Sequence, residues 1–323
     1  MLPDERLLFL DEPGAALALE SDHLVLHLPG RKDSPVKIPF SAISGIVIKG
    51  AASISSPVLI QCAQYGIPVS LLDYSGRLCS SVHAFSSDPS IREKQYHFFS
   101  LSQARLIAAK FFAGGKLRAQ RRVLRNLRSN HPSEVLSVAI HRISAALRKV
   151  EDCDSIPSLR GVEGASAVAY WSAWSEFIPS FHGRGAHPAP DPVNAMLSFG
   201  YAILAHELSA LAVSRKLDLT LSFLHESSGR YPSFVWDLIE PCRPVFVDRL
   251  VFSGFRRRRY SLSDVIRMED GTVLLGSDSM KKFLSDFYAS VSAPRSIPFS
   301  RIPLLQVIDS FIDFMERSIR DYA

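Results

Sequence analysis

RLIAAKFFAGGKLRAQRRVLR, residues 105–125, is the stretch that decides the fold of most of the chain. Its apolar residues recur every three or four positions, the spacing of one face of an α-helix. We therefore expect two helices here, over residues 92–112 and 117–128. The same spacing predicts further helices over residues 133–149, 165–177, 192–216 and 303–322.

The chain before residue 86 has a different pattern, rich in strand-forming residues. Runs typical of strands lie at 23–28, 36–49 and 69–82, and a turn at 73–76 in the last run suggests a hairpin. Residues 57–65 fit one short helix with proline at its first position. Strands at this density predict a small sandwich or packed sheets.

Together these patterns predict an α+β fold. A small β-rich domain over residues 1–85 would precede a larger all-α domain over residues 86–323, with the SSDP sequence at 86–89 as the loop between them. Two domains also suit a chain of 323 residues. Residues 265–276 interrupt the helical spacing, and Asp270-Gly271 between two apolar runs is a signal for a β-hairpin.

The composition is that of a globular protein. Hydrophobic residues make up 47% and charged residues 21% of the chain, so a substantial core can form. The first residues lack the basic start of a signal peptide, and no run reaches the roughly 18 uninterrupted apolar residues of a membrane helix. The four cysteines are too far apart for a zinc-binding pair. We therefore expect free thiols, no membrane contact and a cytoplasmic location.

Positive charge is concentrated in one part of the chain. The net charge is +5, and residues 94–133 hold nine Lys or Arg and no Asp or Glu. Four of these arginines share one side of a helix, at the spacing i, i+3, i+4 and i+7: Arg118, Arg121, Arg122 and Arg125. Such a face suits DNA phosphates, although it could also be a solvated face balanced by distant acids. A second cluster comprises Arg256, Arg257, Arg258 and Arg259.

Sequence motifs of several enzyme classes are absent. The chain has no phosphate-binding GxxxxGK[ST] loop, no GxGxxG, no GxSxG and no HExxH. His206-Glu207 begins like a zinc-protease helix but lacks the second histidine. Candidate chemistry is therefore restricted to two other segments.

The first segment, RGVEGASAVAYWSAW at 160–174, contains one carboxylate. Glu163 stands near the expected start of a mostly apolar helix, between two glycines that let a ligand or a backbone come close. In such surroundings a carboxylate must be paired, protonated or bound to a metal. The alternative is an acid that is favoured by the positive end of the helix dipole.

The second segment, SFLHESSGRYPSFVWDLIEPCRPVFVDRL at 222–250, contains a histidine and an acidic pair. His225 follows an apolar run, and Pro232 can open a short helix on which Asp237 and Glu240 share one face. Two carboxylates and an imidazole form a plausible cage for Mg²⁺ or Mn²⁺. A structural role for the histidine remains the alternative.

In these segments the sequence resembles the CRISPR-associated integrase family, the universal CRISPR-adaptation endonuclease. The matching stretches are 160–171, 191–204, 222–251 and, more weakly, 105–125, and Arg92 and Gln95 fit the RxxQ opening of the family's helical domain. The resemblance implies a β domain used for dimerisation and partner contacts, and an all-α catalytic domain. It assigns the metal site to Glu163, His225 and Glu240, with Asp237 close by as a ligand or a supporting acid.

The resemblance also implies a function. Homodimers would join a small ferredoxin-like adaptation partner, and the complex would insert short DNA fragments (spacers) into the repeat DNA of a CRISPR array. A 3′-hydroxyl would attack a phosphodiester with help from the metal. Water in its place would give endonuclease activity. The arginines named above would hold DNA through its backbone.

Three other interpretations are open. A casposase-like transposon integrase would use the same site on mobile-element ends without the small partner. A non-catalytic DNA-binding scaffold would have a degenerate site, but every expected type of ligand residue is present. A metal-dependent hydrolase of small phosphoesters would leave the arginine face unexplained.

Overall fold

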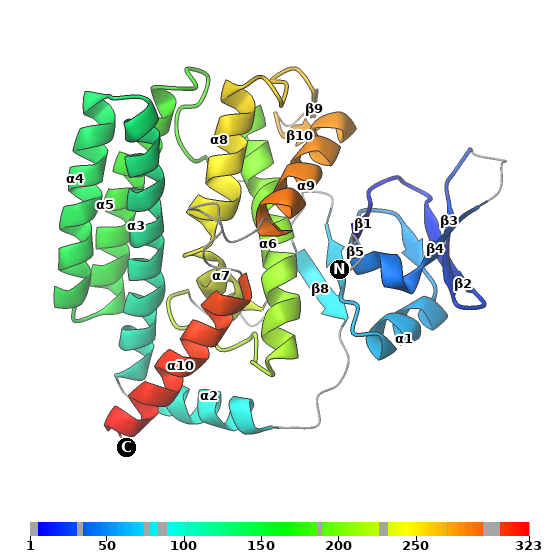
Figure 1. Ribbon diagram of the computed structural model, residues 1–323, viewed down its shortest axis with the longest axis horizontal. Coiled ribbons are helices and arrows are strands. Elements are labelled where there is room, and N and C mark those ends of the chain that lie inside the picture. The colour runs from blue at the N-terminus through cyan, green and yellow to red at the C-terminus, as the bar shows by residue number, and fades with distance from the viewer. Residues whose placement is uncertain are drawn as a thin grey trace. The chain divides into compact units, whose positions relative to one another are not determined.

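The structure is a computed structural model, and it describes residues 6–30, 35–73, 78–82, 89–101, 103–185, 189–225, 232–269, 271–292 and 304–322. The chain divides into two compact units, Met1–Pro89 and Ser90–Ala323. The first is built mainly of β-strands and the second mainly of helices (Figure 1). The α+β class predicted from the sequence is confirmed.

In its described residues, the first unit contains two four-stranded sheets, one α-helix and a short 3₁₀ helix at Phe40–Ala42. Its elements are β1 (Arg6–Leu10), β2 (Ala16–Glu20), β3 (His23–His27), β4 (Val36–Pro39), β5 (Ile43–Lys49), β6 (Ser53–Ile54), α1 (Ser56–Gln64), β7 (Val69–Leu72) and β8 (Leu78–Val82). One sheet has the order β1-β5-β7-β8 and the other β4-β3-β2-β6. Leu17, Leu24, Ile46 and Val58 belong to one buried cluster that draws on both sheets and on α1.

Pairing within these sheets was only partly predictable. β7 and β8 form the expected antiparallel pair, and residues 74–77 of its turn lie outside the described residues. The parallel pairing of β5 with β1 and β7 was not anticipated. A parallel pair needs a crossover connection: α1 lies in the connection between β5 and β7, and β2, β3 and β4 lie in the connection between β1 and β5.

The second unit is a helical assembly with one short hairpin (Figure 1). Its elements are α2 (Ser90–Ser100), α3 (Ala104–Asn130), α4 (Glu134–Asp152), α5 (Ile156–Ser175), α6 (Pro192–Ser214), α7 (Ser233–Ile239), a π-helix (Pro244–Asp248), α8 (Arg249–Arg256), β9 (Val265–Arg267), β10 (Val273–Leu275), α9 (Ser277–Ser292) and α10 (Leu304–Tyr322). Helices α3, α4 and α5 pack side by side. β9 and β10 pair antiparallel, and Asp270 lies outside the described residues.

Helix α6 is the core helix of this unit. It begins at Pro192 after a cap in which the Asp191 carboxylate accepts from the Asn194 amide at 2.8 Å. By length and composition alone it could cross a membrane, but most of its apolar window is buried by the surrounding helices. Its hydrophobicity is therefore that of a core helix.

The expected helix break between residues 112 and 117 is wrong. Instead, α2 ends at Ser100 and α3 begins at Ala104, and α3 runs without interruption through Gly114 and Gly115. A Cβ atom at Gly115 would lie 3.0 Å from the Cβ of Pro241. Gly115 therefore lets the segment after α7 come close to α3, and it does not end the helix.

Gly200 on α6 offers a test of this packing. A Cβ atom there would lie 2.5 Å from Val247 Cγ1 and 2.7 Å from Phe283 Cζ, and both neighbours are fully buried. We expect Gly200→Ala to destabilise the helical unit by about 1–3 kcal/mol through overpacking. Thermal unfolding would measure the loss.

The matched control is Gly161→Ala on α5, where nothing lies within 4 Å of the added methyl. Helix propensity alone should make this variant more stable than the wild type, by about 0.5–1 kcal/mol. Equal unfolding temperatures for the two variants would contradict the packing described here.

Candidate active site

The structure brings the four acid and imidazole residues of the sequence analysis into one place. α5 carries Glu163, the segment before residue 226 carries His225, and α7 with the residue after it carries Asp237 and Glu240. His225 Nε2 lies 3.8 Å from Glu240 Oε1. Among the described residues, no group of three or more His, Cys, Asp and Glu is close enough to hold a metal ion as it stands. A fifth residue, a lysine, occupies the centre.

Lys116 on α3 is that residue, and its ammonium links the two glutamates. Lys116 Nζ contacts Glu163 Oε1 and lies 2.8 Å from Glu240 Oε2. Burial by itself would lower the pKa of Lys116, but the carboxylates of Glu240 and Glu163 raise it, so the amine stays charged. The sequence analysis counted Lys116 only as one charge in a basic stretch, and nothing in the local pattern marked it as the partner of two distant acids.

Glu240 is an ionised carboxylate in a buried position. Its side chain is 2% exposed, and its Oε1 lies 3.0 Å from Arg243 Nη1 in an ion pair. Burial alone would raise the pKa of Glu240, but Arg243, Lys116 and His225 lower it from 4.5 to about 2. The sequence analysis missed Arg243, although the spacing i, i+3 from Glu240 could have indicated it.

Asp237 has a different role from Glu240, because protein donors already occupy its oxygens. Oδ2 accepts from Ser222 Oγ at 3.0 Å and from the amides of Phe223 and Leu224 at 2.6 and 3.1 Å. Oδ1 accepts from the amide of His225 at 3.1 Å and lies 2.6 Å from its Nδ1. The fully buried Asp237 thus fixes residues 222–225 and turns His225 so that Nε2 is the nitrogen near Glu240.

Glu163 lies further inside its helix than expected. α5 begins at Ile156 after a cap by Ser155. The helix dipole stabilises an acid only in the first turn of a helix, and Glu163 lies beyond that turn. The interpretation as a helix-start acid is therefore wrong. A Cβ atom at Gly161 or Gly164 would meet nothing within 4 Å. The space next to these two glycines, which flank Glu163 in the sequence, is therefore open. A site that admits a ligand needs such space.

A buried network supports the site from behind. Tyr170 on α5 and Tyr201 on α6 donate to the two oxygens of Asp248, at 3.0 and 2.6 Å. The Arg243 guanidinium stacks over the Tyr201 ring, 4.6 Å from its centroid. The network joins α5, α6 and the π-helix, and it fixes the arginine that pairs with Glu240.

The arginine face predicted on α3 keeps its positive charge in the structure. Arg118 and Arg125 are exposed, while Arg121 and Arg122 are half-buried. Burial, Arg125 and Arg118 together lower the pKa of Arg121. The two neighbouring arginines thus add to the effect of burial, as like charges on one helix face do.

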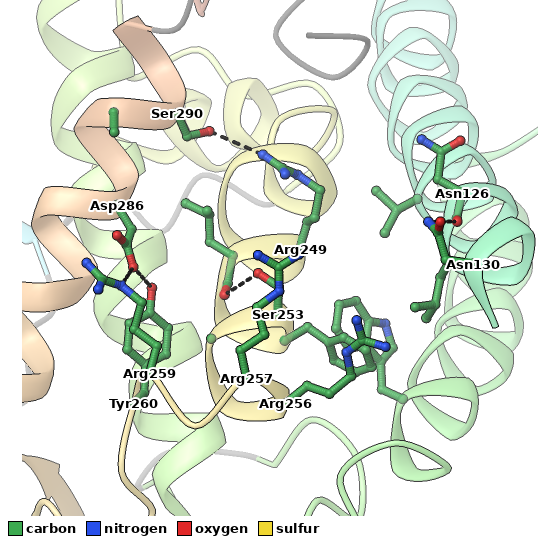
Figure 2. A pocket seen from close by; sticks show the side chains of 17 residues that line it. Asn126, Asn130, Arg249, Ser253, Arg256, Arg257, Arg259, Tyr260, Asp286 and Ser290 are labelled. Carbon is green, nitrogen blue, oxygen red and sulfur yellow. Dashed lines mark hydrogen bonds and ion pairs between the residues drawn. The ribbon is translucent and has the colours of Figure 1, made fainter.

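The arginines of the second cluster, residues 256–259, make different contacts. Arg259 Nε donates to Asp286 at 2.5 Å, and Arg256 contacts the ring of His131. Arg256, Arg257 and Arg259 line a groove, and Arg258 is not among its lining residues. Three of the four arginines therefore share one groove (Figure 2), and their role in DNA binding stays a prediction.

The chain is similar to known proteins over most of its length. Residues 8–289 match the model of the CRISPR associated protein Cas1 family. A CRISPR-associated endonuclease Cas1 from Rhodospirillum rubrum is 33% identical over 309 residues, which cover 90% of this chain and 88% of the relative. One from Chlorobaculum tepidum is 29% identical over 291 residues, covering 87% of this chain and 84% of the relative.

Solved structures share the fold. A CAS1 protein from Thermotoga maritima aligns with a TM-score of 0.83 at 16% identity, covering 96% of this chain and 97% of that one. A casposase bound to integration product aligns with a TM-score of 0.83 at 26% identity, covering 97% of this chain and 91% of that one. With the family model spanning nearly the whole sequence, the chain belongs to the Cas1 family of CRISPR-associated proteins.

Proposed function

We propose that this protein is a divalent-metal-dependent DNA endonuclease and integrase, which inserts short DNA fragments into a CRISPR array. The observation that carries the proposal is that a single cation, the Lys116 ammonium, contacts both Glu163 and Glu240. The names of the curated relatives, which are endonucleases, support the reaction class.

The residues fit a hard divalent cation such as Mg²⁺ or Mn²⁺. The ammonium of Lys116 serves as a stand-in ion, since it shows that one cation can contact both carboxylates at once. Glu163, Glu240 and His225 Nε2 would hold the metal, and two carboxylate oxygens with one imidazole are ligands that these ions accept. Asp237 would orient His225 from behind through its Nδ1, which keeps Nε2 directed at the ion.

In the proposed reaction the 3′-oxygen of a DNA fragment forms a bond to a phosphorus of the repeat strand. The bond from that phosphorus to the adjoining 3′-oxygen breaks, and the leaving oxygen gains a proton as the attacking hydroxyl loses one. A bound divalent ion would assist deprotonation of the hydroxyl and neutralise phosphoryl charge. Water as the attacking group gives cleavage of the strand at the same site.

DNA would lie along α3. Arg118, Arg121, Arg122 and Arg125 would contact phosphates without selecting a sequence. The proposal includes assembly as a homodimer with a small ferredoxin-like adaptation partner. A solved Cas6-RT-Cas1–Cas2 complex, which aligns over 98% of this chain with a TM-score of 0.79, supports a partner of this kind. We place the protein in the cytoplasm, consistent with four free cysteines.

A casposase-like transposon integrase is the second candidate, favoured by the alignment with the casposase structure. It would join transposon ends without the small partner. A joining assay that compares mobile-element ends with short spacer-like duplexes, with and without the partner, separates the two functions. The CRISPR proposal predicts that joining depends on the partner.

The metal ligands can be tested by removing them. We expect Glu163→Ala and His225→Ala each to reduce fragment joining to a repeat-containing plasmid by about 100-fold or more, because removal of a supporting outer residue alone costs 10–100-fold. The exposed Glu151 provides the matched control, Glu151→Ala, which should retain activity. Full activity of Glu163→Ala with added Mn²⁺ would remove this residue from the mechanism.

The stand-in role of Lys116 predicts opposite effects on metal binding and on stability. Lys116→Met should bind Mn²⁺ about tenfold more tightly or better, because the metal no longer has to displace an ammonium. Without metal, the same variant should be less stable by about 3–5 kcal/mol, because Glu240 loses a buried partner.

Calorimetric titration with Mn²⁺ and thermal unfolding in a chelator would measure these two quantities. Lys110→Met, on the same helix, is the control, since the Lys110 ammonium donates to the backbone oxygen of Glu151. Weaker Mn²⁺ binding by Lys116→Met would show that the lysine assists the metal instead of competing with it.

The arginine face predicts a change in salt dependence. Replacing both exposed arginines, in Arg118→Glu/Arg125→Glu, should weaken duplex DNA binding and reduce the slope of log affinity against log salt by about two. Arg142→Glu/Arg148→Glu places the same charges on exposed positions of α4 as a control. An unchanged slope in the α3 variant would mean that the face is merely solvated.

A further inference from the structure

The segment that ends at His225 has no regular secondary structure. Residues 221–225 belong to neither a helix nor a strand, so the backbone hydrogen bonds of regular structure do not hold them. Their position depends on side chains from other elements. Asp237 accepts from the amides of Phe223, Leu224 and His225. The carbonyl oxygens of the segment and the ring of Phe223 have further partners outside the candidate site.

Two arginines hold the carbonyl oxygens of this segment. Arg105 Nε of α3 donates to the oxygen of Phe223 at 3.4 Å, and Arg160 Nη2 of α5 donates to that of Leu224 at 2.9 Å. The bond from Arg160 is the shorter and therefore the stronger of the two. Together with Asp237 on the amide side, these donors fix the backbone just before His225.

Four aromatic rings surround the fully buried ring of Phe223. Its centroid lies 5.5–5.7 Å from the centroids of four phenylalanines, Phe98 and Phe99 of α2, Phe234 of α7 and Phe311 of α10. Rings at such distances attract one another beyond the effect of the area that they bury. Phe223 thus joins three helices to the segment that carries His225.

Phe311 lies in the middle of this aromatic cluster and is fully buried. Its ring centroid lies 5.1 Å from that of Phe112 on α3 and 5.1 Å from that of Phe234 on α7, in addition to its contact with Phe223. A fully buried side chain has few places to go, because protein interiors are close-packed. The position of the Phe223 ring therefore depends on the ring of Phe311.

α10 carries Phe311 and lies beyond residue 289, where the match to the family model ends. The helix packs against α2 and α6 (Figure 1). Asp309 pairs with Arg215 at 2.8 Å, and Glu316 pairs with Lys94 at 2.7 Å. Solvent-accessible pairs of this kind add little stability. They do select which face of α10 meets the aromatic cluster.

Loss of the Phe311 ring would leave a cavity beside Phe223, which the surrounding residues can fill only in part by moving. Phe223 is two residues from His225, so its movement changes the direction of Nε2. A misplacement of about 1 Å caused by a distant mutation can cost on the order of 100-fold in rate. We propose that Phe311 is a positioning residue, which acts through Phe223 to keep His225 Nε2 directed towards Glu240. This inference rests on the proposed function, which makes His225 a metal ligand.

Hydrogen exchange in the metal-free, full-length protein tests the position of the segment without any catalysis. In Phe311→Ala, the amides of residues 223–225 should exchange about tenfold faster relative to the amides of α4, because the local opening that exposes them becomes easier. Phe287→Ala is the matched control. Phe287 is also fully buried, and its ring lies against Phe283 and Tyr288 on α9. The control should lower the unfolding temperature but leave this exchange ratio unchanged.

Fragment joining with Mn²⁺ supplies a second measurement. Phe311→Ala should lower the joining rate at saturating DNA by about 10–100-fold. The DNA concentration that gives half the maximal rate should not change, because the buried Phe311 offers DNA no surface. Phe311→Leu keeps most of the apolar volume, so we expect it to fold and to show both effects at about threefold. It decides the question where the alanine variant does not fold.

Two results would overturn the proposal and make Phe311 an ordinary core residue. One is an unchanged exchange ratio at residues 223–225 in Phe311→Leu, and the other is an equal loss of joining in Phe287→Ala. Failure of the proposed function appears separately, as a wild-type protein that joins no DNA although the Phe311 variants still change the exchange ratio.

Discussion

One buried carboxylate constrains the whole helical unit. Glu240 is almost fully enclosed and ionised, and an unpaired charge in such a place would cost several kcal/mol. Lys116 from α3 and Arg243 from the following turn offset this cost, and His225 Nε2 lies 3.8 Å from Glu240 Oε1. The pairing is possible because Gly115 lets Pro241 approach α3 closely, so that the residues next to each, Lys116 and Glu240, come into contact. The backbone contact and the ion pair are thus parts of one arrangement.

The same arrangement gives Asp237 and Glu240 different roles, which the sequence alone did not distinguish. Asp237 and Glu240 share a helical face, and either could have been the direct ligand. In the structure the oxygens of Asp237 accept from three backbone amides, a hydroxyl and the histidine, whereas those of Glu240 face the cationic side chains of Lys116 and Arg243. A carboxylate that holds backbone amides cannot turn towards an ion without leaving those donors unpaired, and each would cost about 1–3 kcal/mol. For Glu240 to bind a metal ion, in contrast, the ion has only to replace the ammonium of Lys116.

The sequence was sufficient to identify most residues of the candidate site, but it did not show which side chains pair with one another in space. Helical spacing located α4, α6 and α10 closely, and the motif blocks indicated Glu163, His225, Asp237 and Glu240. Lys116 was not recognised, because an ion pair between residues 116, 163 and 240 depends on three helices meeting and leaves no local pattern. The continuity of α3 through its glycines was missed for the same reason, since a glycine pair has the same sequence whether it ends a helix or admits a neighbour. The parallel strands of the first unit likewise depend on a crossover, and not on the composition of each strand.

In the proposed function, these constraints make α3 the element that relates the chemistry to DNA. It packs against α4 and α5 along its length, so its rise per residue fixes the spacing of its side chains. Gly115 and Lys116 belong to the carboxylate cluster, and the arginines follow within the next turns. A loop could carry the same residues, but it would not hold a basic face at a constant distance from the reacting centre. Because the ion pairs of Lys116 tie α3 to α5 and to the segment after α7, loss of those pairs would disturb the site and the arginine face together.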